Sequence, residues 1–203
     1  MNLKKRAVII GLGRIGLGEK KFKNFNSHFS LYNNSTHINL VAVVDVDKKK
    51  LSLVKHLNRN IKILKSINEL KKIKYDILSI CIPTSKTYKL VKNLSQNNLL
   101  PKTVFLEKPI SYNLKELIKI KKILINKNIF INYTRLWDPK IYKFFIKKKN
   151  FIYGNVLFTK NLLNSAIHMV VLLIYFFGGI KRFACYKSNM RKYLGYEFTL
   201  YFK

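Results

Sequence analysis

Short apolar runs recur along the first two thirds of the chain and are separated by more polar stretches. Each run has four to six residues and stops at a polar or turn-forming position; the runs are 6–10, 40–45, 61–64, 77–82, 103–107 and 129–132. Most of the stretches between them have helical periodicity. Strands that alternate with helices predict right-handed crossovers and a mainly parallel sheet. We therefore expect an α/β fold with a Rossmann-type, doubly wound sheet.

Local signals refine this outline. The run at 77–82 is almost continuously apolar, which is typical of a strand covered on both faces. Ser66 with Glu69, and Asn113 with Glu116, have the spacing of capping boxes and predict helix starts. The segment 20–37 is longer than one plain helix needs, so we expect a loop and a broken helix there.

The alternation of strands and helices ends near residues 137–139, where Trp137, Asp138 and Pro139 precede a new helix. We expect a dinucleotide-binding domain over 1–137 and a partial α+β domain over 138–203. The final residues, 200–203, have the pattern of a strand. This predicts an incomplete antiparallel sheet and a truncated second domain. The most apolar run, 167–177, is shorter than the roughly 20 residues that span a bilayer, so we expect a buried helix and no membrane span.

Composition narrows the class of protein. Of 203 residues, 48% are hydrophobic, which is enough for a sizeable core. The 40 lysines and arginines against 9 acids give a net charge of +31. Such a charge can indicate a nucleic-acid partner, but the lysines are scattered among Asn, Ile, Phe and Tyr, whose codons can be written in A and T alone. Genome composition explains this pattern, and we expect no specific nucleic-acid partner.

The cysteines and the N-terminus bear on the cellular compartment. Cys81 and Cys185 have neither the spacing of a disulfide framework nor that of metal ligands. The basic start is followed by an apolar run that Arg14 interrupts, without a small-residue cleavage site. These features predict a cytoplasmic protein with no metal site.

The strongest chemical signal is the stretch 7–16, in which an apolar run leads into Gly11, Gly13 and Gly16. In a phosphate-binding turn the three glycines allow a tight turn, close approach of a pyrophosphate and close helix packing. Arg14 and Ile15 belong to the same turn, and the next helix N-terminus offers N–H groups to phosphates. A glycine triplet alone also fits a plain strand-to-helix turn.

Asp45 strengthens the dinucleotide interpretation because it ends the second strand, where an acid binds the adenosine ribose. A carboxylate repels a 2′-phosphate, so NAD is favoured over NADP. The lysines at 48–50 partly offset that repulsion and leave NADP as an alternative.

Three further strand ends carry candidate ligand-binding residues, because ligands of doubly wound sheets lie beyond the carboxyl ends of the strands. They are 81–84, which contains Pro83 and Thr84, 107–109, which contains Glu107 and Lys108, and 132–135, which contains Arg135. Pro109 can hold a cis bond that directs Lys108 toward the nicotinamide. The alternative is a surface lysine before a helix-initiating proline.

These features occur together in one known family. The turn 11–16, Asp45, Pro83–Thr84, Glu107-Lys-Pro109, Asn132-Tyr-Thr-Arg135 and a late His168 follow the order of the glucose-fructose oxidoreductase, inositol dehydrogenase and MocA (Gfo/Idh/MocA) family. The chain resembles that family over nearly its whole length, most strongly up to Pro139. It looks most similar to members from sugar and surface-polysaccharide biosynthesis.

The resemblance implies an NAD(P)-dependent oxidoreductase acting on a secondary hydroxyl or ketone of a sugar, polyol or nucleotide-linked sugar. Lys108 would bind the reacting oxygen, and His168 would serve as general acid and base. Arg135 and Asn164 would contact the small-molecule substrate, since Asn164 lies four residues before His168. Without the family, a core histidine is the simpler interpretation of His168.

The chain also departs from the family pattern. Val171 stands where an acid usually follows the histidine, Thr87 replaces a frequent histidine, and Leu136 replaces a frequent arginine. Together with the early end, these changes support a second hypothesis, a truncated non-catalytic remnant that only binds the dinucleotide. The sequence leaves open the substrate, the reaction direction and the oligomeric state, for which a homo-oligomer is one expectation.

Overall fold

The computed structural model describes residues 3–18, 27–147, 162–188 and 195–202. Contacts divide the chain into two compact units, Met1–Asn132 and Tyr133–Lys203. The predicted boundary at 137 lies a few residues beyond this division. The assignment of a separate role to each unit stays a prediction.

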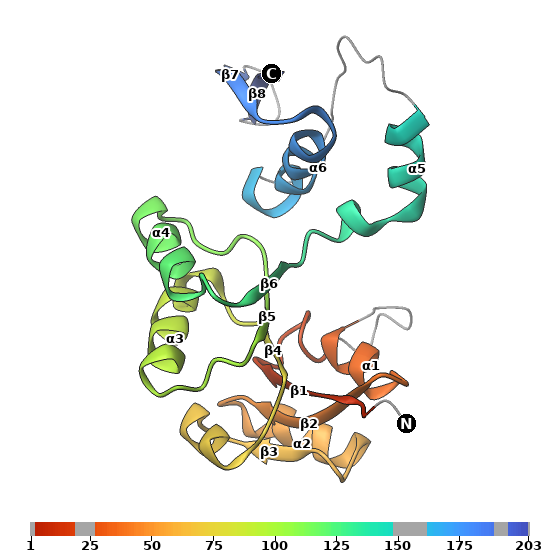
Figure 1. The fold of residues 1–203 in the computed structure, drawn as a ribbon, viewed down its shortest axis with the longest axis vertical. Coiled ribbons are helices and arrows are strands. Elements are labelled where there is room, and N and C mark those ends of the chain that lie inside the picture. Colours follow the sequence, from red (N-terminus) through yellow and green to blue (C-terminus); the bar gives the residue numbers. More distant parts are fainter. Residues whose placement is uncertain (1–2, 19–26, 148–161, 189–194, 203) are drawn as a thin grey trace. The chain divides into compact units, whose positions relative to one another are not determined.

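The first unit is built on one parallel sheet of six strands (Figure 1). The strands are β1 (Lys5–Ile10), β2 (Ile38–Val44), β3 (Lys62–Leu64), β4 (Ile77–Ile80), β5 (Thr103–Leu106) and β6 (Asn128–Ile131). Their order is β3-β2-β1-β4-β5-β6, and every neighbouring pair is parallel. This is the strand order of a doubly wound sheet, in which the chain adds β2 and β3 on one side of β1 and then β4, β5 and β6 on the other side. It confirms the predicted α/β fold class.

Helices cover both faces of this sheet. They are α1 (His28–Asn33), α2 (Lys48–Leu57), α3 (Thr84–Gln96) and α4 (Leu114–Ile123), with a 3₁₀ helix η1 (Ile67–Lys72) after β3. The side chains of Asp47 and Asn113 cap α2 and α4 by accepting backbone N–H bonds. Ser66 and Glu69 form a full capping box on η1. The helix starts predicted at Ser66 and Asn113 are confirmed, but Glu116 accepts a hydrogen bond from the Ser111 hydroxyl and does not close the predicted box, and the Asp47 cap was not predicted.

The side chains of β1 point alternately into two hydrophobic clusters, one on each face of the sheet. Val8 and Ile10 belong to the cluster that includes residues of α3 and α4, whereas Ala7 and Ile9 belong to the cluster with α1 and α2. All four side chains are at most 5% exposed. Because successive strand residues point to opposite faces, these four buried apolar residues show that β1 is covered on both sides, the arrangement that was predicted for the run 77–82.

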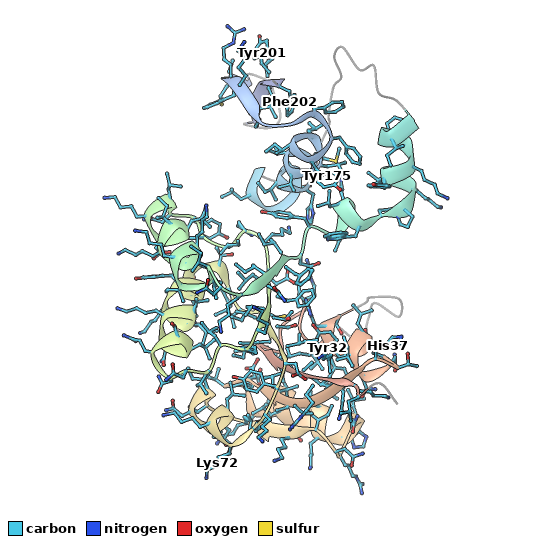
Figure 2. The ribbon with its side chains drawn as sticks, viewed as in Figure 1. Tyr32, His37, Lys72, Tyr175, Tyr201 and Phe202 are labelled. Carbon is cyan, nitrogen blue, oxygen red and sulfur yellow. The ribbon has the colours of Figure 1, made fainter. Side chains whose placement is uncertain are left out.

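Two buried hydroxyl groups in the core of this unit, those of Tyr32 and Ser79, are hydrogen-bonded to each other. Tyr32 of α1 is labelled in Figure 2. Its hydroxyl shares a 2.7 Å hydrogen bond with Ser79 Oγ on β4. Burial raises the pKa of Tyr32 to about 12. This bond lets a polar strand residue lie inside the core without an unsatisfied hydroxyl.

The second unit contains helices and a small antiparallel sheet. Its elements are η2 (Thr134–Trp137), α5 (Pro139–Lys147), the π-helix η3 (Leu162–Ala166), α6 (Ile167–Phe177), β7 (Ile180–Ser188) and β8 (Gly195–Phe202). The run 167–177 is helical as predicted, but only Leu172 of it is fully buried, and Tyr175 is 58% exposed. Among helices in the described ranges, none is long and apolar enough to cross a bilayer.

Candidate functional site

The turn after β1 is shaped by glycines that tolerate no side chain. At Gly11 the backbone has φ +94°, and a Cβ would lie 2.5 Å from the carbonyl oxygen of Cys81. At Gly16 a Cβ would lie 1.9 Å from the carbonyl oxygen of Gly11. Contacts this short with backbone atoms cannot be relieved by a side-chain rotation. Both glycines are therefore required by the fold of the turn itself.

Gly13 differs from the other two glycines because its surroundings are open. No described atom lies within 4 Å of the place a Cβ would occupy there. The fold thus imposes no glycine at this position, while a ligand that packs against the backbone would. This open site is where the sequence predicts close approach of a pyrophosphate.

The helix expected directly after the glycines is not found in the described part of this segment. Residues 14–17 form a turn closed by the N–H of Leu17, which donates to the carbonyl of Gly13 at 2.8 Å. Arg14 is exposed in this turn and Ile15 is half-buried. The next described helix, α1, begins only at His28, so the predicted helix N-terminus beside the phosphates is corrected to a single turn.

Asp45 follows β2 and reaches the glycine turn. Its Oδ2 accepts a hydrogen bond of 2.5 Å from the N–H of Leu12, and its Oδ1 accepts one of 2.8 Å from the N–H of Asp47. Each carboxylate oxygen keeps a further lone pair. The acid expected to bind a ribose is thus held at the glycine turn, with acceptor capacity for hydroxyl groups.

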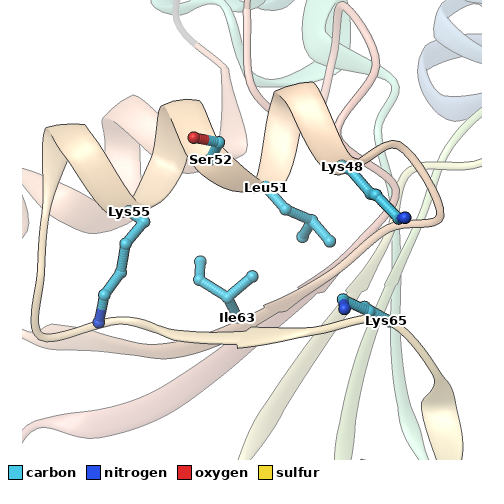
Figure 3. A pocket seen from close by; sticks show the side chains of 6 residues that line it. All are labelled: Lys48, Leu51, Ser52, Lys55, Ile63 and Lys65. Carbon is cyan, nitrogen blue, oxygen red and sulfur yellow. The ribbon is translucent and has the colours of Figure 1, made fainter.

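A basic groove lies between α2 and β3 (Figure 3). This groove is open to solvent, has a volume of about 530 Å³ and is lined by Lys48, Leu51, Ser52, Lys55, Ile63 and Lys65. Figure 3 shows Lys48 and Lys65 at the end where β3 stops, with Lys55 at the opposite end. Lys48 lies three residues after Asp45. The ammonium groups of Lys48 and Lys65 therefore flank the region beyond the carboxylate that is predicted to bind the ribose.

The Glu107-Lys-Pro turn follows β5 and is joined to the turn after β4. The peptide bond between Lys108 and Pro109 is cis, as the sequence allows. The hydroxyl of Thr84, the first residue of α3, donates a 3.0 Å hydrogen bond to the carbonyl of Pro109. Pro83 precedes it as an exposed residue, and Lys108 is half-buried. The hydrogen bond between Thr84 and Pro109 joins the two predicted strand-end segments.

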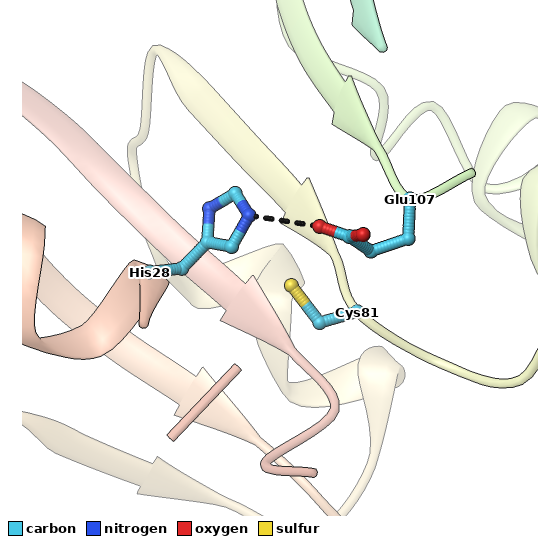
Figure 4. Close-up of side chains that lie close together, drawn as sticks. All are labelled: His28, Cys81 and Glu107. Carbon is cyan, nitrogen blue, oxygen red and sulfur yellow. Dashed lines mark hydrogen bonds and ion pairs between the residues drawn. The ribbon is translucent and has the colours of Figure 1, made fainter. Parts of the chain in front are cut away.

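Glu107 is the centre of a polar cluster (Figure 4). Its Oε1 shares a hydrogen bond of 3.2 Å with His28 Nε2 and accepts another of 2.7 Å from Asn132 Nδ2. The Cys81 thiol lies beside the same pair, and the three ligand-type atoms of His28, Cys81 and Glu107 lie within 4.8 Å of one another. Burial raises the pKa of the Cys81 thiol well above its usual value, and the Glu107 carboxylate adds to that shift.

Sequence reasoning did not identify His28 or Cys81 as members of this cluster. Glu107 and Asn132 were found because both stand at strand ends. Cys81 begins the segment 81–84 that the strand-end rule had selected, but only Pro83 and Thr84 of that segment were named as candidates. His28 follows an irregular segment and has no periodic or motif signal, so its approach to Glu107 is visible only in the structure.

The remaining candidates lie in the second unit. Arg135 is exposed on η2, and Asn164 lies on the π-helix η3, where its side chain falls outside the described residues. His168 lies near the start of α6, and its ring meets the Tyr133 ring edge-on at 6.0 Å. Burial raises the pKa of Tyr133. The approach of these residues to those of the first unit stays a prediction.

Comparisons with known proteins agree with the fold. The Gfo/Idh/MocA family model, described as an oxidoreductase family with an NAD-binding Rossmann fold, matches residues 5–133. The WlbA dehydrogenase from Bordetella pertussis, solved with NADH and UDP-GlcNAcA, is 16% identical with a TM-score of 0.76; the match covers 99% of this chain and 68% of that one. No curated protein matches the chain.

Two inositol dehydrogenases are also similar in structure. Myo-inositol 2-dehydrogenase from Lactobacillus plantarum is 20% identical with a TM-score of 0.67, covering 94% of this chain and 61% of that one. Apo scyllo-inositol dehydrogenase from Lactobacillus casei is 16% identical with a TM-score of 0.69, covering 93% and 60%. The chain thus spans about three fifths of the length of these two enzymes.

Proposed function

The chain belongs to the Gfo/Idh/MocA oxidoreductase family, and from this premise we propose that it binds NAD in its first unit and moves a hydride between nicotinamide and a secondary hydroxyl or ketone. The observation that carries the proposal is the convergence of three segments at the carboxyl edge of one sheet. These are the glycine turn, Asp45 and the Glu107–Pro109 turn.

The roles of the cofactor-binding residues follow from their surroundings. The open backbone at Gly13 accepts the pyrophosphate, with Arg14 and Ile15 in the same turn. Asp45 accepts hydrogen bonds from the adenosine ribose with the lone pairs that Leu12 and Asp47 leave available. Pro83, Thr84 and Glu107 border the nicotinamide end.

The proton chemistry is assigned to two side chains. NAD, when bound, supplies or accepts the hydride. Oxidation of a secondary alcohol also removes the hydroxyl proton, and ketone reduction returns it. Lys108 donates a hydrogen bond to the reacting oxygen, and the imidazole of His168 takes up or returns the proton near neutral pH. Arg135 and Asn164 orient the substrate.

Nucleotide-linked sugars are the substrate class that we propose first. The WlbA dehydrogenase was solved with UDP-GlcNAcA, and a diphosphate-linked sugar acid is an anion. A chain with a net charge of +31 attracts such an anion electrostatically, whereas a neutral inositol is not attracted in this way. A role in surface-polysaccharide biosynthesis accords with this class, and neutral sugars and polyols are the alternative.

Titration with NADH tests the cofactor part of the proposal. The measurement follows nicotinamide fluorescence at about 0.15 M salt, where surface charges are screened beyond about 8 Å. We expect saturable binding that Asp45→Ala weakens. Asp76→Ala is the matched control, because Asp76 also accepts a backbone N–H bond, from Arg6, but precedes β4 and lies at the amino edge of the sheet. Equal losses in both variants would contradict the assignment of Asp45.

The second candidate function is dinucleotide binding without turnover. It is favoured by Val171, which lies one helical turn after His168 on α6 and cannot orient an imidazole by hydrogen bonding. Oxidation of NADH that depends on a sugar substrate, and is lost in His168→Ala, would exclude this candidate. Binding of NADH without turnover of any nucleotide-linked sugar or polyol tested would support it.

A further inference from the structure

The cluster around Glu107 contains one nitrogen, one sulfur and one oxygen atom of the types that bind transition metals. His28 Nε2 lies 3.2 Å from Glu107 Oε1, and Cys81 Sγ completes a set in which all separations are within 4.8 Å (Figure 4). In a tetrahedral zinc site with bonds of about 2.0–2.3 Å, neighbouring ligand atoms lie roughly 3.3–3.8 Å apart. Side-chain shifts of about 1 Å therefore suffice to form such a site.

The backbone fixes the three residues before any metal binds. The N–H of Cys81 donates to the carbonyl of Ile10 at 2.7 Å, which holds the cysteine against the end of β1. The N–H of His28 donates to the carbonyl of Ile15 at 3.0 Å, which ties α1 to the glycine turn. Glu107 follows the buried strand β5 directly. Ligands held on three separately anchored segments lose little entropy when they bind a cation.

We propose that His28, Cys81 and Glu107 form a binding site for a divalent transition metal of the zinc type. Imidazole and thiolate donors select such ions over Mg²⁺ and Ca²⁺, which prefer oxygen ligands only. Asn132 remains hydrogen-bonded to the glutamate and orients it as a second partner. Three protein ligands leave a fourth position for solvent or another ligand.

Protons and charge balance in this site. Binding sends the Cys81 thiol proton to solvent, and the neutral imidazole carries its proton on Nδ1 while Nε2 binds the metal. The thiolate and the Glu107 carboxylate then supply two negative charges to a doubly charged cation. This local neutralisation matters in a chain with a net charge of +31, whose long-range repulsion of cations is screened at about 0.15 M salt. The site does not rest on the proposed oxidoreductase function.

Titration of the purified chain with Co²⁺ tests the proposal. We expect one equivalent to bind with a near-ultraviolet thiolate-to-cobalt absorption band, and Zn²⁺ to displace it. Cys81→Ser abolishes the band, and His28→Gln weakens binding by at least roughly tenfold, since even outer-shell changes cost that much. Cys185→Ser, which removes the exposed second cysteine, keeps the band and is the matched control.

A measurement on the unaltered chain covers the case in which Cys81→Ser does not fold. Zn²⁺ is expected to slow alkylation of Cys81 and to leave alkylation of Cys185 unchanged, as read by peptide mass spectrometry. Absence of the cobalt band in the unaltered chain, or its loss in Cys185→Ser with retention in Cys81→Ser, would overturn the proposal. So would equal alkylation of Cys81 with and without Zn²⁺.

Discussion

The N–H of Leu12 donates a hydrogen bond to Oδ2 of Asp45, and this contact joins the glycine turn to the end of the neighbouring strand. The two residues are 33 positions apart in the sequence and meet because β1 and β2 pair in parallel. Parallel strands end at the same edge of a sheet, so the turn after one and the acid after the other become neighbours.

The three glycines of the turn fall into two classes, which replacement of each glycine by alanine distinguishes. Gly13→Ala meets open space and is expected to fold normally but to bind NADH weakly, because the added methyl group occupies the space of the pyrophosphate. Gly16→Ala places a Cβ 1.9 Å from the Gly11 carbonyl oxygen and is expected to destabilise the fold. Thermal unfolding together with NADH titration separates the two. A stable Gly16→Ala chain, or an unaltered NADH affinity in Gly13→Ala, would contradict this division.

Lys48 and Lys65 are expected to set the tolerance for NADP. Replacing both with Ala removes the two cations at the strand end of the groove beside Asp45. Exposed ion pairs contribute about 0.2–1 kcal/mol each, so loss of two cations should lower NADPH affinity about two- to thirtyfold more than NADH affinity. Lys55→Ala at the far end of the groove is the control and should change the NADPH to NADH ratio little. An unchanged ratio in the double variant would assign NADP tolerance elsewhere.

Lys108 is expected to matter for turnover and not for cofactor affinity. General acid–base groups contribute about 10²–10⁴-fold to rates, so Lys108→Ala should lower kcat by at least about 10²-fold on a substrate of the chain. The NADH dissociation constant should stay within about twofold. Lys102→Ala, an exposed lysine at the amino end of β5, is the control. Loss of NADH binding in Lys108→Ala would show a binding role in place of the proposed one.

Tyr75 is expected to make the fold sensitive to alkaline pH. Burial raises its pKa to about 12, and its hydroxyl donates a 2.5 Å hydrogen bond to the carbonyl of Leu99. In the unfolded chain a tyrosine ionises near pH 10. Between about pH 10 and 12 only the unfolded state loses this proton, so the stability present below pH 10 is lost as the pH rises.

The measurement for Tyr75 is the thermal midpoint between about pH 8 and 11. Tyr75→Phe should start from a lower midpoint, because the bond to Leu99 is gone, and should then fall less steeply with pH. Tyr112→Phe removes an exposed hydroxyl and is the matched control. The same slope in Tyr75→Phe and in the unaltered chain would show that another group causes the alkaline loss.

The parts of the fold that could be predicted are those in which a local pattern of residue types is typical of only one kind of structure. All six parallel strands were predicted within about two residues, because each is a short apolar run bounded by polar or turn-forming residues. Ser66 and Asn113 begin helices as predicted, because their side chains accept the first free backbone N–H bonds. Gly11 has the positive φ and tight backbone contact expected of a tight turn, whereas Gly16 is required by its contact with the Gly11 carbonyl and not by the helix packing that was predicted.

The parts that could not be predicted depend on contacts between distant segments. The approach of His28 to Glu107 joins residues 79 positions apart, and nothing local to His28 indicates it. The turn at 14–17 lies where the start of a helix was expected, since the glycine pattern specifies the turn and leaves the next element open. In α6 the run 167–177 is apolar on every side, so the pattern contains no stripe to show that Leu172 is the fully buried residue.

The contact between Leu12 and Asp45 also restricts how cofactor preference can evolve in this chain. One carboxylate both holds the phosphate-binding turn in place and offers acceptors to the ribose, so two selective pressures act on a single side chain. A mutation that removes its charge to admit a 2′-phosphate would loosen the turn at the same time. The more accessible route to a new preference is to keep Asp45 and alter the lysines around the neighbouring groove, which touch no part of the turn's hydrogen bonding.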